Sequence, residues 1–235
     1  MDKDLGAAVL FTFGDFQLTA TVVTTWGVMA ALAFVSWLAT RRLTLFAPGL
    51  LQTAVEGVVA MMEDTIAAAA PQYARELLPF IGTLWIYLAV ANLVGLIPGL
   101  HSPTRDLSAT SALAILVFCS VHWHGIRSQG LKNYLRHYLS PSPILLPFHL
   151  ISEVTRTIAL AIRLFGNIMS LEMAALLLLM VAGFLAPVPL LMLHVVEALV
   201  QAYIFGTLAL IYVAGGMQSQ ELRQRKDNAK PGDSS

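Results

Sequence analysis

The chain has 235 residues, of which 57% are hydrophobic and only 12% are charged, and its formal net charge is zero. Soluble domains carry about 25% charged residues, so this composition excludes an ordinary soluble protein and predicts a chain that lies mostly in lipid. The neutral balance gives no indication of a nucleic-acid partner. The positions of the few charged residues therefore carry the functional information.

Apolar segments of about 20 residues can cross a bilayer, and several such segments occur in the first half of the chain. They cover residues 16–40, 77–100 and 107–123. Asp106 precedes the third segment and is a candidate helix N-cap. Residues 48–70 differ, because Gln52, Glu56 and Glu63 make a transmembrane span unfavourable there. This segment is predicted to be an amphipathic helix at the membrane interface.

Two long helices are predicted to close the chain, over residues 143–183 and 188–218. A helix of about 40 residues is about 60 Å long, twice the hydrocarbon core of a bilayer, so both helices must tilt strongly. Gly183, Pro187 and Pro189 predict the turn between them. The predicted fold is an all-α membrane protein with about five transmembrane helices and one interfacial amphipathic helix, the last two helices forming a hairpin.

The chain divides into an N-terminal segment (1–15), a single membrane domain (16–218) and a polar tail (219–235) that is predicted to be disordered. The positive-inside rule orients it. With the N-terminus outside, only Lys3 and Arg105 lie on the outer side, and the other Lys and Arg residues outside the spans are cytoplasmic. We therefore expect a periplasmic N-terminus and a cytoplasmic C-terminus.

Arg163 lies near the middle of the 143–183 segment. Arginine stays protonated at any working pH, and a charge at the bilayer centre costs at least about 2.5 kcal/mol. Such a residue is expected to have a function. The alternative is a structural arginine that is paired with Glu153 or Glu172 or that reaches a nearby interface. The face that includes Arg163 is small, polar and cationic, and it consists of Arg156, Ala159, Arg163, Gly166, Asn167 and Ser170.

The last long helix has a polar stripe of its own, formed by His194, Glu197, Gln201 and Tyr212. Ionisable residues inside spans usually face a bundle interior or a water-filled cavity. The alternative is a hydrogen-bonded layer that only joins two helices. His194 and Glu197 could be half of a metal site, but further ligands are not clustered nearby, so no metal is expected. The sequence has no hydrolytic, redox or nucleotide-binding motif, so no cofactor and no enzymatic activity are expected.

The run Arg163-Leu-Phe-Gly-Asn167, followed by Glu172, resembles the signature of subunit a of F-type ATP synthases. Asn92-Leu with Pro98 resembles the N-L-x-x-x-x-P end of a span in that family. Pro103-Thr-x-Asp-Leu resembles its P-T-A-D-L/V motif, and the run that begins at Gln201 resembles its Q-A-F/Y-I-F stretch. The resemblance extends from about residue 75 to the C-terminus and is consistent with a divergent bacterial member.

The resemblance implies a role for each matching residue. Arg163 would be the stator charge that faces the carboxylates of a rotating ring of c subunits, and Asn167 and Gln201 would support it. Glu172 and His194 would line an outer aqueous half-channel. Glu153 would belong to the cytoplasmic half-channel.

Two features depart from the family pattern. Ser170-Leu171 stands before Glu172 where many members have A-G, and Glu197 is an additional acidic residue. Ser170 and Glu197 are nevertheless candidates for the ion pathway. The expected coupling ion is H⁺, which would pass to and from the c-ring carboxylates and couple ion flow to ATP synthesis or hydrolysis, with Na⁺ as the alternative.

The resemblance also implies partners and a location. These are the c ring, the b subunits of the peripheral stalk and the lipid of the bacterial inner membrane, without direct contact to nucleotide. Two other classes compete with this interpretation: a subunit of an unrelated ion transporter, which predicts repeats and broken helices, and a structural membrane subunit with inert polar layers.

Overall fold

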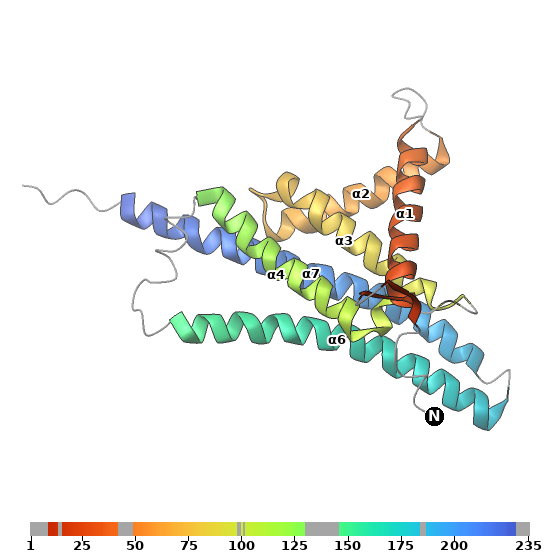
Figure 1. Ribbon diagram of the computed structural model, residues 1–235. Helices are drawn as coiled ribbons and strands as arrows, with labels where there is room; N and C mark the ends of the chain where they lie inside the picture. The colour runs from red at the N-terminus through yellow and green to blue at the C-terminus, as the bar shows by residue number, and fades with distance from the viewer. Residues whose placement is uncertain are drawn as a thin grey trace, which may run out of the picture.

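The computed structural model describes residues 9–13, 16–41, 49–97, 100, 102–129, 146–183 and 187–228. In these ranges the chain is almost entirely helical, as Figure 1 shows. A short antiparallel hairpin, β1 (Val9–Phe13) and β2 (Phe16–Thr19), precedes the first helix. The all-α membrane fold is confirmed. The hairpin was not predicted, and its second strand takes the first residues of the expected first span.

Five helices in the described ranges are long and apolar enough to cross a membrane. They are α1 (Ala20–Thr40), α3 (Ala74–Val94), α4 (Leu107–Gln129), α6 (Leu146–Ala182) and α7 (Pro187–Asn228). The predicted amphipathic helix is α2 (Leu50–Ala69), and it does not qualify as a span. Its Gln52 side chain donates a hydrogen bond to Glu56 at 2.7 Å along the polar face.

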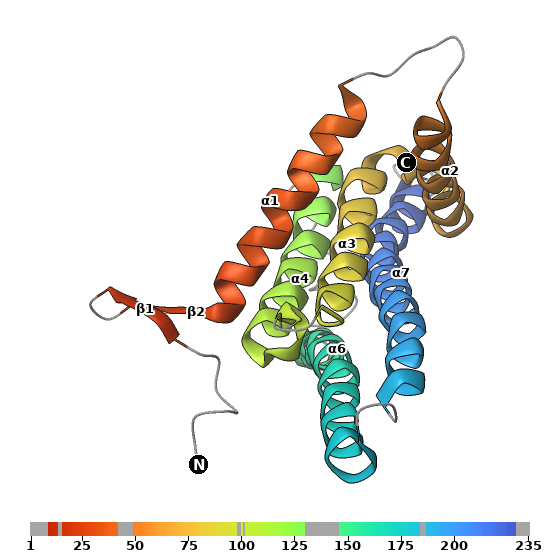
Figure 2. The ribbon, with the colours of Figure 1, turned by 90° about the vertical axis from the view of Figure 1, so that its right-hand side faces the viewer.

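The two closing helices form the predicted hairpin, side by side in Figures 1 and 2. α6 ends at Ala182, and Gly183 follows with φ of 82°, a left-handed conformation that glycine adopts without strain. α7 begins with Pro187, whose missing N–H is harmless in a first helical turn. The helix continues to Asn228, so residues 219–228 are helical where the sequence predicted a disordered tail. This stretch contains many good helix formers, which allow the helix to extend.

α3 packs against α7 through one closely fitted contact. The Trp85 ring stacks on Tyr203 with centroids 6.0 Å apart, and its Nε1 donates a hydrogen bond to the Tyr203 carbonyl at 3.2 Å. A Cβ at Gly206 would lie only 2.1 Å from Trp85 Nε1, so the glycine creates the space for the indole. This contact fixes the position of α7 against the bundle.

α1 is attached to the bundle much more loosely. Figure 1 shows it running steeply across the direction of α4 and α7. Val28 is its only buried residue. At its base, the Thr21 hydroxyl donates a hydrogen bond to Asp106 at 3.0 Å. The other oxygen of Asp106 accepts from the Ser108 backbone N–H at 3.0 Å, which confirms Asp106 as the N-cap of α4.

Candidate functional site

Arg163 lies on α6, near the middle of the candidate span Ile151–Ala182. Its side chain is exposed, whereas Leu160, Leu164 and Ile168 on the adjoining face are buried against the rest of the chain. α6 therefore uses one stripe for packing and turns the arginine outward. A charged residue at the surface of a span must meet either lipid or another polar partner.

No acidic side chain pairs with Arg163 in the part of the chain that the structure describes. Glu172 is instead bound to Arg105, and Glu153 lies 3.8 Å from His122 Nε2. The alternative in which Arg163 is an internal ion pair with Glu153 or Glu172 is therefore wrong for this fold. Within the described residues, the guanidinium of Arg163 therefore has no ion pair.

One predicted pair of polar residues does meet next to Arg163. Asn167 Nδ2 donates a hydrogen bond to Gln201 Oε1 at 2.8 Å and joins α6 to α7. Gln201 is 2% exposed, and its Nε2 has no hydrogen-bond partner within the described residues. Buried amide donors are nearly always satisfied, so this nitrogen marks a place where water or a polar group belongs.

A second contact joins the two helices on the same face of α6. The guanidinium of Arg156 lies over the ring of Tyr212, 4.5 Å from the centroid. A cation over an aromatic face is attracted by the ring's electron density. The polar stripe of α7 therefore faces α6 at Gln201 and at Tyr212. The aromatic contact holds Arg156, while Arg163, seven residues later in the sequence, has no such partner among the described residues.

The residues that were predicted to line the outer half-channel lie on α6 and α7, and they differ in burial and in partners. Glu172 is half-buried and pairs with Arg105, which lies two residues before the start of α4, with Arg105 Nη1 3.0 Å from Glu172 Oε2. His194 is 3% exposed, and its Nε2 is buried without a partner in the described ranges. Glu197 is half-buried, and Ser170 is exposed. The pairing of Arg105 with Glu172 was not predicted, because Arg105 was interpreted only as a cation on the outer side. The available signal was an arginine inside the P-T-x-D motif.

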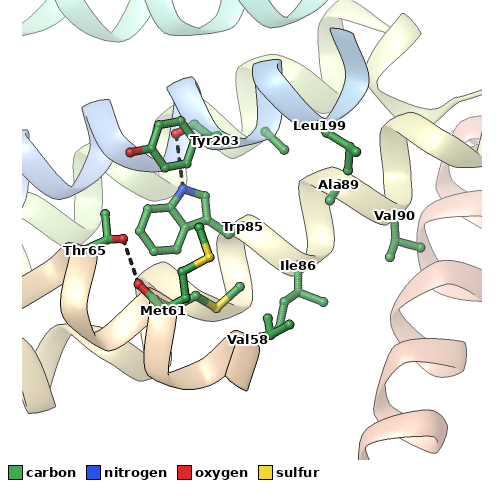
Figure 3. A pocket seen from close by; sticks show the side chains of 11 residues that line it. Val58, Met61, Thr65, Trp85, Ile86, Ala89, Val90, Leu199 and Tyr203 are labelled. Atoms are coloured by element: carbon green, nitrogen blue, oxygen red, sulfur yellow. Dashed lines mark hydrogen bonds between the residues drawn. The ribbon is translucent and has the colours of Figure 1, made fainter. Parts of the chain in front are cut away.

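A cavity of about 310 Å³ between α2, α3 and α7 lies apart from these charges (Figure 3). Apolar side chains such as Val58, Ile86 and Leu199 form most of its lining. The hydroxyl of Thr65, which also lines the cavity, donates a hydrogen bond to the Met61 carbonyl of the same helix. It contains no charged group that could attract an ion. Among the described residues, no three His, Cys, Asp or Glu side chains gather as a metal site.

Apolar spans together with an unpaired cation and buried, unsatisfied polar atoms define an α-helical, multi-pass membrane protein with polar groups inside its bundle. Comparison with known proteins gives the family. The profile described as ATP synthase A chain matches residues 22–214. The chain belongs to the subunit a family of ATP synthases and is a membrane subunit of the F-type complex, acting with other subunits in ATP synthesis and ion transport.

The similarity covers nearly the whole chain. ATP synthase subunit a 1 of Hahella chejuensis is 65% identical over 218 residues, which are 93% of this chain and 92% of that protein. ATP synthase subunit a 2 of Pelobacter propionicus is 62% identical, over 92% of this chain and 94% of that protein. ATP synthase subunit a of Legionella pneumophila is 52% identical, over 93% and 95%. The family match sets aside the interpretation as a subunit of an unrelated transporter.

Proposed function

We propose that this chain is the proton-conducting stator subunit of a rotary F-type ATP synthase, with Arg163 as its stator charge. The observation that carries the proposal is that Arg163 is exposed in mid-span and has no ion pair within the described residues. An unpaired guanidinium in hydrocarbon is unfavourable, so the residue requires an acidic partner from outside the chain. The membrane carboxylates of a c ring that turns past α6 are such partners.

Arg163 acts by favouring the ionised form of the carboxylate in front of it. A ring carboxylate that approaches the arginine releases its proton into one half-channel, and after passing it takes a proton from the other. The permanent charge of Arg163 also repels protons, which prevents direct flow between the half-channels. Because one charge that crosses the membrane potential is worth about 2.3 kcal/mol per 100 mV, such a leak would dissipate the driving force.

The residues around Arg163 divide between positioning and conduction. Asn167 and Gln201 hold α6 and α7 together at 2.8 Å beside the arginine, and the unpartnered Nε2 of Gln201 is available to water in the path. Glu172 and His194, with Ser170 and Glu197, line the outer half-channel. Glu153 belongs to the cytoplasmic half-channel. The proposal of aqueous paths is supported by buried polar atoms of Gln201, His194 and Glu172, which have no hydrogen-bond partner in the described residues and are expected to contact water.

The chain lies in the bacterial inner membrane with its N-terminus in the periplasm and its C-terminus in the cytoplasm. The c ring packs along the exposed face of α6, and the b subunits of the peripheral stalk bind elsewhere on the subunit. The subunit makes no contact with nucleotide and performs no bond chemistry. Na⁺ is the alternative coupling ion, because the ion is selected mainly at the ring carboxylate.

The test is ATP-driven pumping in inverted membrane vesicles that contain the whole complex. Arg163→Ala and Arg163→Lys should each abolish pumping while the subunit still assembles, because neither replacement provides the same fixed, forked charge. Arg41→Ala is the matched control, since that guanidinium lies over the Trp37 ring of α1, 4.9 Å from its centroid. Pumping that persists in Arg163→Ala vesicles would refute the stator role. Wild-type vesicles without Na⁺, with and without protonophore, identify the ion.

A further inference from the structure

Arg105 is held on one of the most firmly anchored segments of the chain, the short helix η1 (Pro103–Arg105). The Ser102 hydroxyl donates to the Ala91 carbonyl at 2.9 Å and lies 2.6 Å from the Thr104 hydroxyl. Thr104 in turn donates to Asn92 Oδ1 at 2.7 Å. Ser102, Thr104 and Asn92 are all buried. The backbone that carries Arg105 therefore has little freedom to move.

From this base Arg105 reaches Glu172 on α6. Its Nη1 lies 3.0 Å from Glu172 Oε2, and the two side chains are 31% and 14% exposed. The arginine is thus partly open to the surroundings, while the carboxylate is mostly enclosed. A charged hydrogen bond of this length fixes the orientation of the carboxylate as well as neutralising it.

The second oxygen of Glu172 is in a different situation. Oε1 is buried and has no hydrogen-bond partner in the described part of the chain. Gly95 lies beside this oxygen: a Cβ at residue 95 would lie 3.4 Å from Oε1 and 3.1 Å from Ser102 Cβ, so glycine keeps a side chain away from Oε1. A buried carboxylate oxygen without a partner is unfavourable, so its position requires a cation, a proton or water.

The two carboxylate oxygens of Glu172 therefore have different surroundings. We propose that Arg105 is a positioning residue for the outer ion path. It holds Oε2 so that Oε1 stays turned toward Gly95, where the coupling ion is received. With a proton as the ion, Oε1 accepts it from outer water and later releases it toward the ring carboxylate, which returns Glu172 to its ionised form. The inference rests on the proposed function, in which Glu172 lines the outer half-channel.

Arg105 is the third residue of the run Pro103-Thr-Arg-Asp, directly before Asp106, the N-cap of α4. The competing interpretation is that Arg105 and Glu172 only connect η1 to α6. An ion pair of that kind would affect how much subunit assembles, but not how fast each assembled complex pumps. The pumping rate per complex therefore distinguishes the two interpretations.

The experiment measures the initial rate of ATP-driven pumping in inverted vesicles, normalised to the amount of assembled complex. Arg105→Ala should lower this rate by about tenfold, because truncating one partner leaves the other charge enclosed and unpaired. Arg105→Lys should recover part of the rate, since it restores one charged donor. A wild-type rate per complex in Arg105→Ala would overturn the proposal.

A double substitution tests whether Arg105 acts through Glu172. If it does, Arg105→Ala combined with Glu172→Gln should pump no more slowly than Glu172→Gln alone. A further loss in the double variant would mean that Arg105 acts elsewhere and would contradict the proposal. Gly95→Ala should also slow pumping, because its methyl group narrows the space beside Oε1.

The parallel Arg163→Ala vesicles separate this inference from the proposed function. If Glu172→Gln pumps like the wild type while Arg163→Ala does not, the stator role stands and the role of Arg105 fails. If Arg163→Ala pumps normally, the proposed function fails first. Arg41→Ala remains the control for removal of an arginine that contacts neither site.

Discussion

α3 and α6 are both apolar spans, but they distribute their side chains in opposite ways. In the most apolar window of α3, 44% of the residues are buried, against 17% in α6. The polar groups of α3 find partners on α7: Trp85 bonds Tyr203, and Asn92 bonds Ala198. α6 turns Arg163 outward, with no ion-pair or aromatic partner in the described part of the chain. Composition alone marks both as spans, but their burial differs. α3 packs inside the bundle, whereas under the proposed function α6 presents Arg163 to another subunit.

The largest expected effect on stability comes from Gly206→Ala, on the surface where α7 receives α3. The added methyl would overlap Trp85, since its Cβ would lie 2.1 Å from the indole nitrogen. We expect a loss of about 3 kcal/mol, at the upper end for overpacked sites. The measurement is the midpoint of heat-induced loss of the subunit from the purified complex. Gly215→Ala is the control, because nothing lies within 4 Å of a Cβ there.

Asn92→Leu should have the next largest effect, also through α3. The substitution leaves the Thr104 hydroxyl without its acceptor and the Ala198 carbonyl without the donor that now lies 3.2 Å away. An unsatisfied buried polar group costs about 1–3 kcal/mol, so we expect a loss near 2 kcal/mol in the same assay. Thr83→Val is the control, because that exposed hydroxyl only bonds the Pro79 carbonyl of its own helix. An equal loss of stability from Asn92→Leu and Thr83→Val would contradict a special role for the hydrogen bonds of Asn92.

Gly166→Leu should have the smallest effect on the stability of the subunit. Gly166 lies one turn from Arg163 on α6, and nothing in the described chain lies within 4 Å of a Cβ at that position. The free energy of unfolding should change by less than about 0.5 kcal/mol, as at other open sites. Under the proposed function, pumping should nevertheless fall, because the leucine would separate α6 from the c ring. Unchanged pumping would mean that α3 and α6 differ in burial but that the exposed face of α6 has no role in pumping.

Much of the architecture could be predicted from the sequence, because long apolar runs and their breakers are local signals. The Gly183 turn, the Asp106 N-cap and the amphipathic character of α2 follow from such signals. The proximity of Asn167 and Gln201 agrees with the faces expected from helical periodicity. The β1–β2 hairpin and the extension of α7 to Asn228 were not predicted, since apolar strand residues resemble a span and charged helix formers resemble a tail.

Pairings between distant residues could not be predicted in the same way. Glu172 was expected to line the outer half-channel, but its pairing with Arg105 was not predicted, because the two residues are 67 positions apart in the sequence. Periodicity shows which face a residue occupies and leaves open which helix lies opposite. The fit of Trp85 against Gly206 is a similar case, because neither residue alone indicates the other.

The bond between Asn92 and Ala198 has a consequence for biosynthesis. The two residues are separated by 106 positions, so α3 enters the membrane long before its acceptor on α7 has been translated. Until then, the Nδ2 group of Asn92 lacks this acceptor inside the bilayer, where unsatisfied polar groups are unfavourable. A nascent subunit that terminates before α7 would keep this defect, which gives a cellular protease or insertase a chemical basis for distinguishing truncated chains from finished ones.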